Sequence, residues 1–238
     1  MKIVKPTIIL VRPQLPENIG MTARAMDNCG LKNLILVSPR EIWPNNIALQ
    51  SAANSKIIIS KAKVYNSLNA ALSKFNYVIA TSKRKRFLQK PIITHFDNLF
   101  ESIPQTKKTA IVFGPESSGL SNDDLMLADT IFSINLSRTN TSLNLSHAVL
   151  IVSYKWREFF VFNKTKPKYN RFNSNLASKN DFLNFMDFLK GELIDVGFFR
   201  PEKSTKSMFK NIQTMFLRSS LSKREIQTLW GMIKKLRK

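Results

Sequence analysis

Five short apolar runs alternate with helical patterns through the first two thirds of the chain. The runs TIILV, NLILVS, YVIATS, TAIVFG and TIFSINL are almost continuously hydrophobic, which is typical of strands buried on both faces of a parallel sheet. Helical patterns between them cover residues 18 to 29, 46 to 54, 66 to 75 and 121 to 128, and a long apolar stretch runs from 143 to about 161. This alternation predicts an α/β fold, a parallel sheet flanked by helices.

The pattern changes after about residue 161. Residues 162–180 lose periodicity and are rich in Lys, Asn and Ser, which is typical of a solvated linker. Helical periodicity then returns, and its apolar positions are interpreted as core residues rather than as stacking platforms for bases: Phe182, Phe185, Leu189 and Leu193. We therefore expect a main domain over 1–161, a linker over 162–180 and a helical C-terminal extension over 181–238.

Two helix starts carry a capping pattern. Ser222 and Glu225 have the spacing of a capping box at the start of the last helix, and Ser121 with Asp124 has a similar spacing with Asp in place of Glu. The last helix then presents one apolar face, formed by Ile226, Leu229, Trp230, Ile233 and Leu236.

Charge is the most informative feature of the composition. Lys and Arg total 37 against 16 Asp and Glu, which gives a formal net charge of +21. Such an imbalance favours a polyanionic partner, with nucleic acid first, because phosphates are neutralised and counterions are released on binding. A lysine-rich genome would also produce this composition, so charge alone does not name the partner.

Cysteine and histidine usage excludes two other classes. Cys29 is the one cysteine, so no internal disulfide forms, and His95 and His147 leave too few ligands for a zinc cluster. No apolar run approaches the ~18 residues of a membrane span, and the start of the chain lacks a signal-peptide pattern. We expect a cytoplasmic protein without a metal and without a membrane partner.

Familiar catalytic signatures are absent. The chain has neither a G-x-G-x-x-G fingerprint after a strand nor a Walker loop, which disfavours an ordinary dinucleotide enzyme or NTPase. A hydrolase triad from Ser142, His147 and a carboxylate lacks the G-x-S-x-G elbow. The loop FGPESSGLS and the basic run TSKRKR both follow strands, where α/β folds bind ligands. Each segment also has an ordinary structural explanation: the loop can be a plain strand-to-helix turn, and the basic run can be a solvated face.

The segment NIGMTARAMDNCG is predicted to be a short helix with Asn18 as its N-cap and Gly30 as its C-terminal cap. Arg24 lies about 100° from Ala23 around this helix, on the flank of the apolar face. From there a guanidinium offers a rigid donor fork that suits phosphate.

Taken in order, four segments resemble the three motif blocks of the SPOUT RNA ribose 2′-O-methyltransferases: PENIGMTARAMDNCGLKNLILVSPR, ATSKRKR, VFGPESSGLSNDDL and INLSRTNTSLNLSHAVLIVSYKW. The segments GELIDVGFFRPE and LSKREIQTLWGMI make the chain most similar to the bacterial tRNA (cytidine/uridine-2′-O-)-methyltransferase branch, which modifies the anticodon loop. The resemblance covers nearly the whole chain apart from the linker.

The resemblance implies a SPOUT methyltransferase domain over 1–161 that ends in a trefoil knot. It further implies S-adenosyl-L-methionine as cofactor, tRNA as substrate, a homodimer, and methylation of the cytidine or uridine ribose at nucleotide 32. Ribosomal RNA, another tRNA position, or a catalytically silent RNA-binding protein are the alternatives.

Site residues follow from the same resemblance. The expected catalytic set is Arg24, Glu116, Asn18, Ser142 and Asn144. The expected cofactor contacts are Thr81, Ser82, Lys83, Gly114, Ile134, Ser142, Leu143 and Asn144. The expected RNA contacts are Arg24, Arg84 and Arg86. Since an arginine is almost never deprotonated, Arg24 is expected to grip a phosphate and Glu116 to orient the arginine or its loop. The sequence departs from the family's pattern in two places. LPENIG has Pro16 and Glu17 where the family often has a glycine shortly before NIG, and TSKR takes the place of the family's TSAR.

Overall fold

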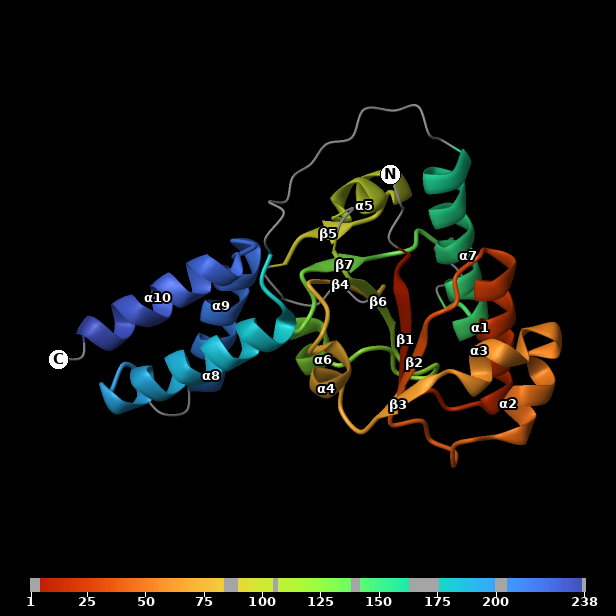
Figure 1. Cartoon of the computed structure of the whole chain (residues 1–238), viewed down its shortest axis with the longest axis horizontal. Helices are drawn as coiled ribbons and strands as arrows, with labels where there is room; N and C mark the ends of the chain where they lie inside the picture. Colours follow the sequence, from red (N-terminus) through yellow and green to blue (C-terminus); the bar gives the residue numbers. More distant parts are fainter. Residues whose placement is uncertain are drawn as a thin grey trace.

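The computed structural model describes residues 5–83, 90–104, 107–137, 142–162, 176–199 and 205–236. The chain forms an α/β domain and a C-terminal group of three helices that extends to one side of it (Figure 1). Arg84, Arg86 and most of the expected linker, residues 163–175, lie outside the described residues.

The α/β domain is built on a seven-stranded sheet with the order β3-β2-β1-β6-β4-β7-β5. Every neighbouring pair is parallel, so the predicted parallel sheet is confirmed. The strands are β1 (Thr7–Val11), β2 (Leu34–Val37), β3 (Lys63–Tyr65), β4 (Tyr77–Thr81), β5 (Ile92–Ile93), β6 (Thr109–Phe113) and β7 (Thr130–Phe132). The five apolar runs form β1, β2, β4, β6 and β7, and the edge strands β3 and β5 were not predicted.

Helices cover both faces of the sheet because alternate strand residues point to opposite faces. Ile8 and Leu10 face one core with α1 (Pro16–Asn28), α2 (Asn46–Ser51), α3 (Lys56–Ser60), α5 (Phe96–Ser102) and α7 (Leu145–Arg157). Ile9 and Val11 face the other core with α4 (Leu68–Leu72) and α6 (Asn122–Met126). A 3-10 turn, η1 (Ala53–Ser55), joins α2 to α3, and a π turn, η2 (Glu158–Phe162), extends α7.

The ends of α1 give one correction and one confirmation. Asn18 is not the N-cap, because α1 begins at Pro16 with Leu15 at the N-cap position, and Asn18 is buried. Proline at the first helical position needs no hydrogen bond for its nitrogen and has a helical φ already. Gly30 has φ +77°, its N–H donates to the carbonyl of Asp27, and the Leu31 N–H donates to that of Met26. These two bonds form the Schellman motif that closes the helix.

The C-terminal extension consists of α8 (Lys179–Asp195), α9 (Thr205–Arg218) and α10 (Lys223–Leu236), of which α9 was not predicted. Phe182, Phe185 and Leu189 are buried in its core, as predicted, and Phe188 stacks on Trp230 with ring centroids 4.6 Å apart. Leu236 does not join that core, since it is 84% exposed in the last turn. The capping box of α10 is confirmed: the Ser222 N–H donates to Glu225 (2.7 Å), and the Glu225 N–H donates to Ser222 Oγ (3.2 Å).

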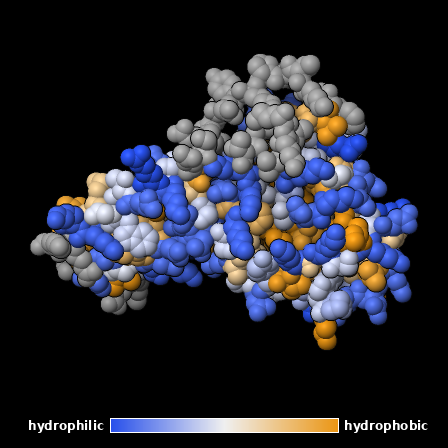
Figure 2. Space-filling model, viewed as in Figure 1, coloured by the Kyte–Doolittle hydropathy of each residue, from blue (hydrophilic) through white to orange (hydrophobic). Residues whose placement is uncertain are grey.

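Polar contacts join the extension to the α/β domain. Lys179 at the start of α8 pairs with Asp129, and its backbone N–H donates to the carbonyl of Phe75 (2.7 Å). Lys210 of α9 pairs with Asp123 of α6 (2.6 Å). In the space-filling view, hydrophilic residues cover most of the visible face of both parts (Figure 2).

Candidate active site

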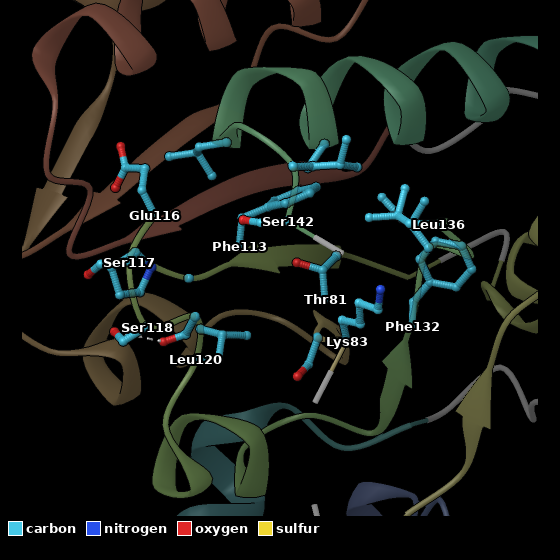
Figure 3. Close-up of a pocket in the computed structure, with 18 residues that line it drawn as sticks. Thr81, Lys83, Phe113, Glu116, Ser117, Ser118, Leu120, Phe132, Leu136 and Ser142 are labelled. Atoms are coloured by element: carbon cyan, nitrogen blue, oxygen red, sulfur yellow. Dashed lines mark hydrogen bonds between the residues drawn. The ribbon is translucent and has the colours of Figure 1, made fainter. Parts of the chain in front are cut away.

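A cavity of about 550 Å³ lies at the carboxyl ends of β4, β6 and β7. Three loops and the start of α7 form its walls. Figure 3 shows Ser117, Ser118 and Leu120 on one side of this space and Phe132 and Leu136 on the opposite side. The carboxyl edge of a parallel sheet is where α/β proteins bind ligands, and the volume lies in the range of small-molecule sites, about 300–1,000 Å³.

The loop after β6 depends on glycine for its close fold. A Cβ on Gly114 would lie 2.3 Å from the Leu120 nitrogen and 2.5 Å from the Gly119 carbonyl carbon, closer than any side chain allows. Gly119 has φ +65°, a left-handed conformation that glycine adopts without strain. The two glycines let residues 114–120 fold back on themselves and line the cavity with backbone groups.

Beside the cavity, a chain of hydrogen bonds joins three distant segments. Asn18 Nδ2 donates to Glu116 Oε1 (2.7 Å), and Asn144 Nδ2 donates to Asn18 Oδ1 (2.8 Å). Asn144 Oδ1 accepts from the backbone N–H (2.9 Å) and the hydroxyl (2.7 Å) of Ser146, and so caps α7. The motifs that carry Asn18, Glu116 and Asn144 are therefore held together by their side chains.

Glu116 also supplies the cap that α1 lacks in its own sequence. Leu15 at the N-cap position makes no side-chain cap. Instead, the Gln14 N–H donates to Glu116 Oε2 (2.9 Å) and the Leu15 N–H donates to Oε1 (3.4 Å). A carboxylate at a helix N-terminus satisfies free N–H groups and interacts favourably with the helix dipole. The loop after β6 thus fixes the entry of the helix that carries Arg24.

Arg24 lies on α1 with its side chain exposed. Within the described part of the chain, its guanidinium has no hydrogen bond or ion pair. Arg24 does not line the cavity. An unpaired, exposed guanidinium on the helix that this network anchors is free to contact a ligand that binds from solvent.

The structure brings most of the expected cofactor residues to one place. Seven of the eight line the cavity: Thr81, Ser82, Lys83, Gly114, Ile134, Ser142 and Leu143. Asn144 does not line it but caps the adjacent α7. Thr81 Oγ1 donates to the Val112 carbonyl (3.0 Å), and the Ser82 N–H donates to the Phe132 carbonyl (2.9 Å), which ties the three loops to one another.

Sequence reasoning missed several cavity residues. Besides the seven expected cofactor contacts and Glu116, the lining residues are Phe113, Pro115, Ser117, Ser118, Gly119, Leu120, Phe132, Leu136, Leu145 and Ala148. The serines lie within the loop FGPESSGLS, so position after a strand was a usable signal. The apolar ones are indistinguishable from core residues in a sequence.

Within the described ranges, no three His, Cys, Asp or Glu residues gather where they could hold a metal ion, and no helix is long and apolar enough to cross a membrane.

Comparison with known proteins gives the class that this fold and cavity define. Residues 5–154, more than half of the chain, match the model of the SpoU rRNA Methylase family. The chain belongs to this family of methyltransferases, as the resemblance of its motifs predicted.

The C-terminal extension matches a second model, the tRNA methyltransferase TrmJ C-terminal domain, over residues 180–238. One relative is the tRNA (cytidine/uridine/adenosine-2′-O-)-methyltransferase TrmJ of Pseudomonas aeruginosa, 32% identical over 97% of this chain and 93% of that protein. The crystal structure of TrmJ from Z. mobilis ZM4 is 34% identical with a TM-score of 0.86, covering 98% of this chain and 99% of that one.

A more distant structure shares the fold. The SpoU methyltransferase AviRb from Streptomyces viridochromogenes, solved in complex with the cofactor AdoMet, is 20% identical with a TM-score of 0.53, over 68% of this chain and 63% of that one.

Proposed function

We propose that this protein transfers a methyl group from S-adenosylmethionine to a ribose 2′-hydroxyl of tRNA, at the cytidine or uridine at nucleotide 32. The observation that carries the proposal is the hydrogen-bonded set of Glu116, Asn18 and Asn144 beside a cofactor-sized cavity. This set fixes the start of α1, the helix that also carries Arg24, whose guanidinium has no partner among the described residues. The activity of the Pseudomonas relative, as its name states it, supports tRNA as the substrate and the 2′-oxygen as the methylated atom. Methylation of ribosomal RNA or of another tRNA position is the alternative.

The cavity fits the cofactor. Its walls combine backbone groups of the Gly114 loop with the apolar side chains of Leu120, Ile134 and Leu136, a mixture suited to an adenosine and an amino-acid chain. We assign the cofactor contacts to Thr81, Ser82, Lys83, Gly114, Ile134, Ser142 and Leu143, with Asn144 holding the start of α7. When bound, the cofactor supplies a methyl group on a sulfonium that is already a good leaving group.

Arg24 carries the catalytic role in this proposal. Its guanidinium grips the phosphate next to the reacting ribose, aligns the 2′-oxygen and stabilises the negative charge that develops on it. Because arginine stays protonated, the hydroxyl proton leaves to that phosphate or to water. Glu116 and Asn18 act through α1 as positioning residues, and Ser142 shapes the cavity wall.

We further propose that the domain carries the trefoil knot of its relatives. β7 pairs with β4 and β5 at one side of the sheet, whereas α7, the next helix, packs against α1 near the other. The chain therefore returns across the carboxyl ends of the strands, where Ile134 and Leu143 both line the cavity. A return of this kind through the earlier loops is what a knot requires.

We also propose a homodimer that forms on α1 and α7. These helices lie side by side (Figure 1), and they expose the apolar side chains of Met21 (40%), Leu150 (40%) and Tyr154 (54%). Sedimentation at micromolar concentration tests this: we expect twice the monomer mass, and a monomer counts against the dimer. We expect the protein in the cytoplasm, where tRNA is processed.

Calorimetry and modification mapping test the main proposal. We expect saturable binding of S-adenosylmethionine or its demethylated product. We also expect a new 2′-O-methyl group at nucleotide 32 when the full chain is incubated with S-adenosylmethionine and with tRNA from a strain that lacks this modification. If the protein binds neither S-adenosylmethionine nor its demethylated product, the proposed enzymatic function is wrong, and a catalytically silent RNA-binding protein is the remaining interpretation. A methyl group elsewhere in tRNA, or in ribosomal RNA, would select the alternative.

A further inference from the structure

A second cavity, of about 1,000 Å³, lies at the opposite edge of the sheet from the candidate active site. Residues at or next to the ends of β1, β2, β3 and β6 line it, together with Ala71 near the end of α4 and Lys74 and Phe75 shortly after that helix. Because a strand rises about 3.3 Å per residue, the five-residue strands separate the two cavities by roughly 16 Å. The second cavity is therefore not part of the first.

Its lining is strongly basic. Six of its 14 lining residues are lysines, against 37 Lys and Arg in 238 residues overall, and none of the lining residues is acidic. The lysines are Lys5, Lys32, Lys61, Lys63, Lys74 and Lys108. This enrichment exceeds what the basic composition alone would give.

Four of these lysines have no side-chain partner among the described residues. Lys5 Nζ donates to the Gly30 carbonyl (2.7 Å), and Lys32 pairs with Asp27. The side chains of the other four are exposed, and none of them bonds to any residue in the described part of the chain: Lys61, Lys63, Lys74 and Lys108. Unpaired ammonium groups around one concavity repel one another and focus a positive potential there, so a bound polyanion would stabilise them.

The floor of the cavity is apolar. Leu34, Ile35 and Ala71 line it with the aromatic rings of Tyr65 and Phe75. Phosphate oxygens suit the lysine rim, and an apolar, aromatic floor suits an unpaired base. A lysine rim over such a floor matches the two parts of a nucleotide in an RNA chain.

We propose that this lysine cavity binds a phosphate-bearing segment of the RNA substrate away from the methylated nucleotide, and so contributes affinity rather than chemistry. This inference rests on the proposed function, because the ligand is the same RNA molecule. A tRNA is long enough to contact both edges of a sheet this narrow. The lysine cavity then serves to select a whole tRNA over a short fragment.

The experiment uses one quadruple variant and one matched control. The first carries Lys61→Gln, Lys63→Gln, Lys74→Gln and Lys108→Gln. The second carries Lys56→Gln, Lys190→Gln, Lys206→Gln and Lys235→Gln, exposed lysines outside this cavity that give the same change in net charge. We measure the Kd for tRNA over a salt series, steady-state methylation, melting temperature and S-adenosylmethionine binding.

The first variant is expected to bind tRNA at least about tenfold more weakly near physiological salt and to lose roughly 3 units of the slope of log K against log salt, about 0.7–0.9 for each lost phosphate contact. Its KM for tRNA rises while kcat, cofactor affinity and melting temperature stay near wild type. The control is expected to lose much less affinity. An equal loss in both variants overturns the proposal, because general charge then explains the binding.

The remaining outcomes separate the possible failures. If wild type methylates tRNA and the first variant does so with unchanged Kd and slope, the inference fails and the proposed function stands. If wild type neither binds nor methylates tRNA, both this inference and the proposed function are wrong. If the first variant keeps its tRNA affinity but no longer binds ATP in calorimetry, while wild type does, the cavity takes a free nucleotide and the RNA assignment is wrong.

Discussion

Arg24 is the residue on which the proposed chemistry depends. We expect Arg24→Ala to lower single-turnover methylation by about 10²- to 10³-fold, the usual effect of removing one group that stabilises developing charge. Cofactor affinity and melting temperature stay nearly unchanged, because the side chain is exposed and has no bonded partner in the described structure. Arg24→Lys is expected to lose turnover too, since lysine keeps the charge without the bidentate fork.

The control for Arg24 is Asn28→Ala, an exposed residue of the same helix. Near-normal turnover in Arg24→Ala would overturn the catalytic assignment. A fall in melting temperature with activity in proportion to the folded fraction would instead make Arg24 a structural residue.

Gly114 supports a second prediction for a single residue. Gly114→Ala would push a methyl group into the backbone of residues 119 and 120, so the loop must move. Overpacking of this kind costs about 1–3 kcal/mol, and we expect calorimetry to show cofactor affinity reduced by about tenfold or more. Gly231→Ala is the control, because its Cβ meets nothing within 4 Å. There the loss of a helical glycine raises stability by about 0.5–1 kcal/mol. Unchanged affinity in Gly114→Ala would show that the loop does not hold the cofactor.

Single residues also show where sequence reasoning succeeds. Gly30 and the Ser121–Asp124 box were predictable because each depends on neighbours within three or four positions, and both are present. Asn18 was misassigned as an N-cap because the real cap, Glu116, lies 98 positions away along the chain. No local pattern contains that information.

For helix α1, the hydrogen-bonded chain through Asn18 gives a prediction about stability. Asn18 is 2% exposed and bonds to Glu116 and to Asn144. Asn18→Leu keeps the approximate volume but leaves both partners without it, and one buried polar group without a partner costs about 1–3 kcal/mol. We expect urea unfolding to show a loss of that order, against less than about 0.5 kcal/mol for Asn28→Leu, which changes an exposed asparagine of the same helix. Equal losses would mean that the bonds contribute nothing specific.

Whether a strand could be predicted from the sequence depended on how fully it is buried. β1, β2, β4 and β6 are buried along nearly their whole length, so each reads as an apolar run. β3 is an edge strand whose first two residues, Lys63 and Val64, are exposed, and β5 has only two residues. An edge position removes the need for a continuous apolar run, and with it the pattern that sequence reasoning depends on.

At the scale of the whole molecule, the junction between the two parts contains a buried lysine. Lys90 is 7% exposed, and its Nζ donates to the carbonyls of Met126 (2.7 Å) and Ala128 (2.6 Å). Burial lowers the pKa of Lys90 from 10.5 to about 7, with Asp129 opposing the shift and Lys179 adding to it. Between pH 7 and about 10 the unfolded chain therefore binds the extra proton, so this group makes the protein more stable as pH rises.

The test compares melting temperatures of wild type and Lys90→Met across this range. We expect the melting temperature of the wild type to rise relative to that of Lys90→Met steadily from pH 7 upward. The gain levels off near pH 10.5, where Lys90 of the unfolded chain also loses its proton. Tyr77, whose pKa is raised by burial to about 12, is present in both proteins, so its contribution cancels in the comparison. Parallel curves for the two proteins would show that Lys90 does not titrate in this way.

The order of strands in the sheet was beyond pattern reasoning. Periodicity predicts which segments are strands, but it does not say that β6 lies between β1 and β4, or that β7 lies beyond β4. Only the resemblance to a family gave an expectation of how the chain returns to its first helix. The seven cavity residues that were expected came from that resemblance too, since they lie on three loops that no single stretch of sequence brings together.

The bonds from Asn18 have a consequence for the protein while it is being made. Glu116 lies 98 positions after Asn18, and Asn144 lies 126 positions after it. At a synthesis rate of about 5–20 residues per second, the ribosome needs roughly 5–20 s after α1 to produce Glu116 alone. During that time the first helix has been synthesised without its cap, and its buried asparagine has neither partner. The nascent chain therefore waits until residue 144 of 238, about three fifths of its length, before these three segments can join, and a chain truncated before Asn144 leaves the ribosome without that set of bonds.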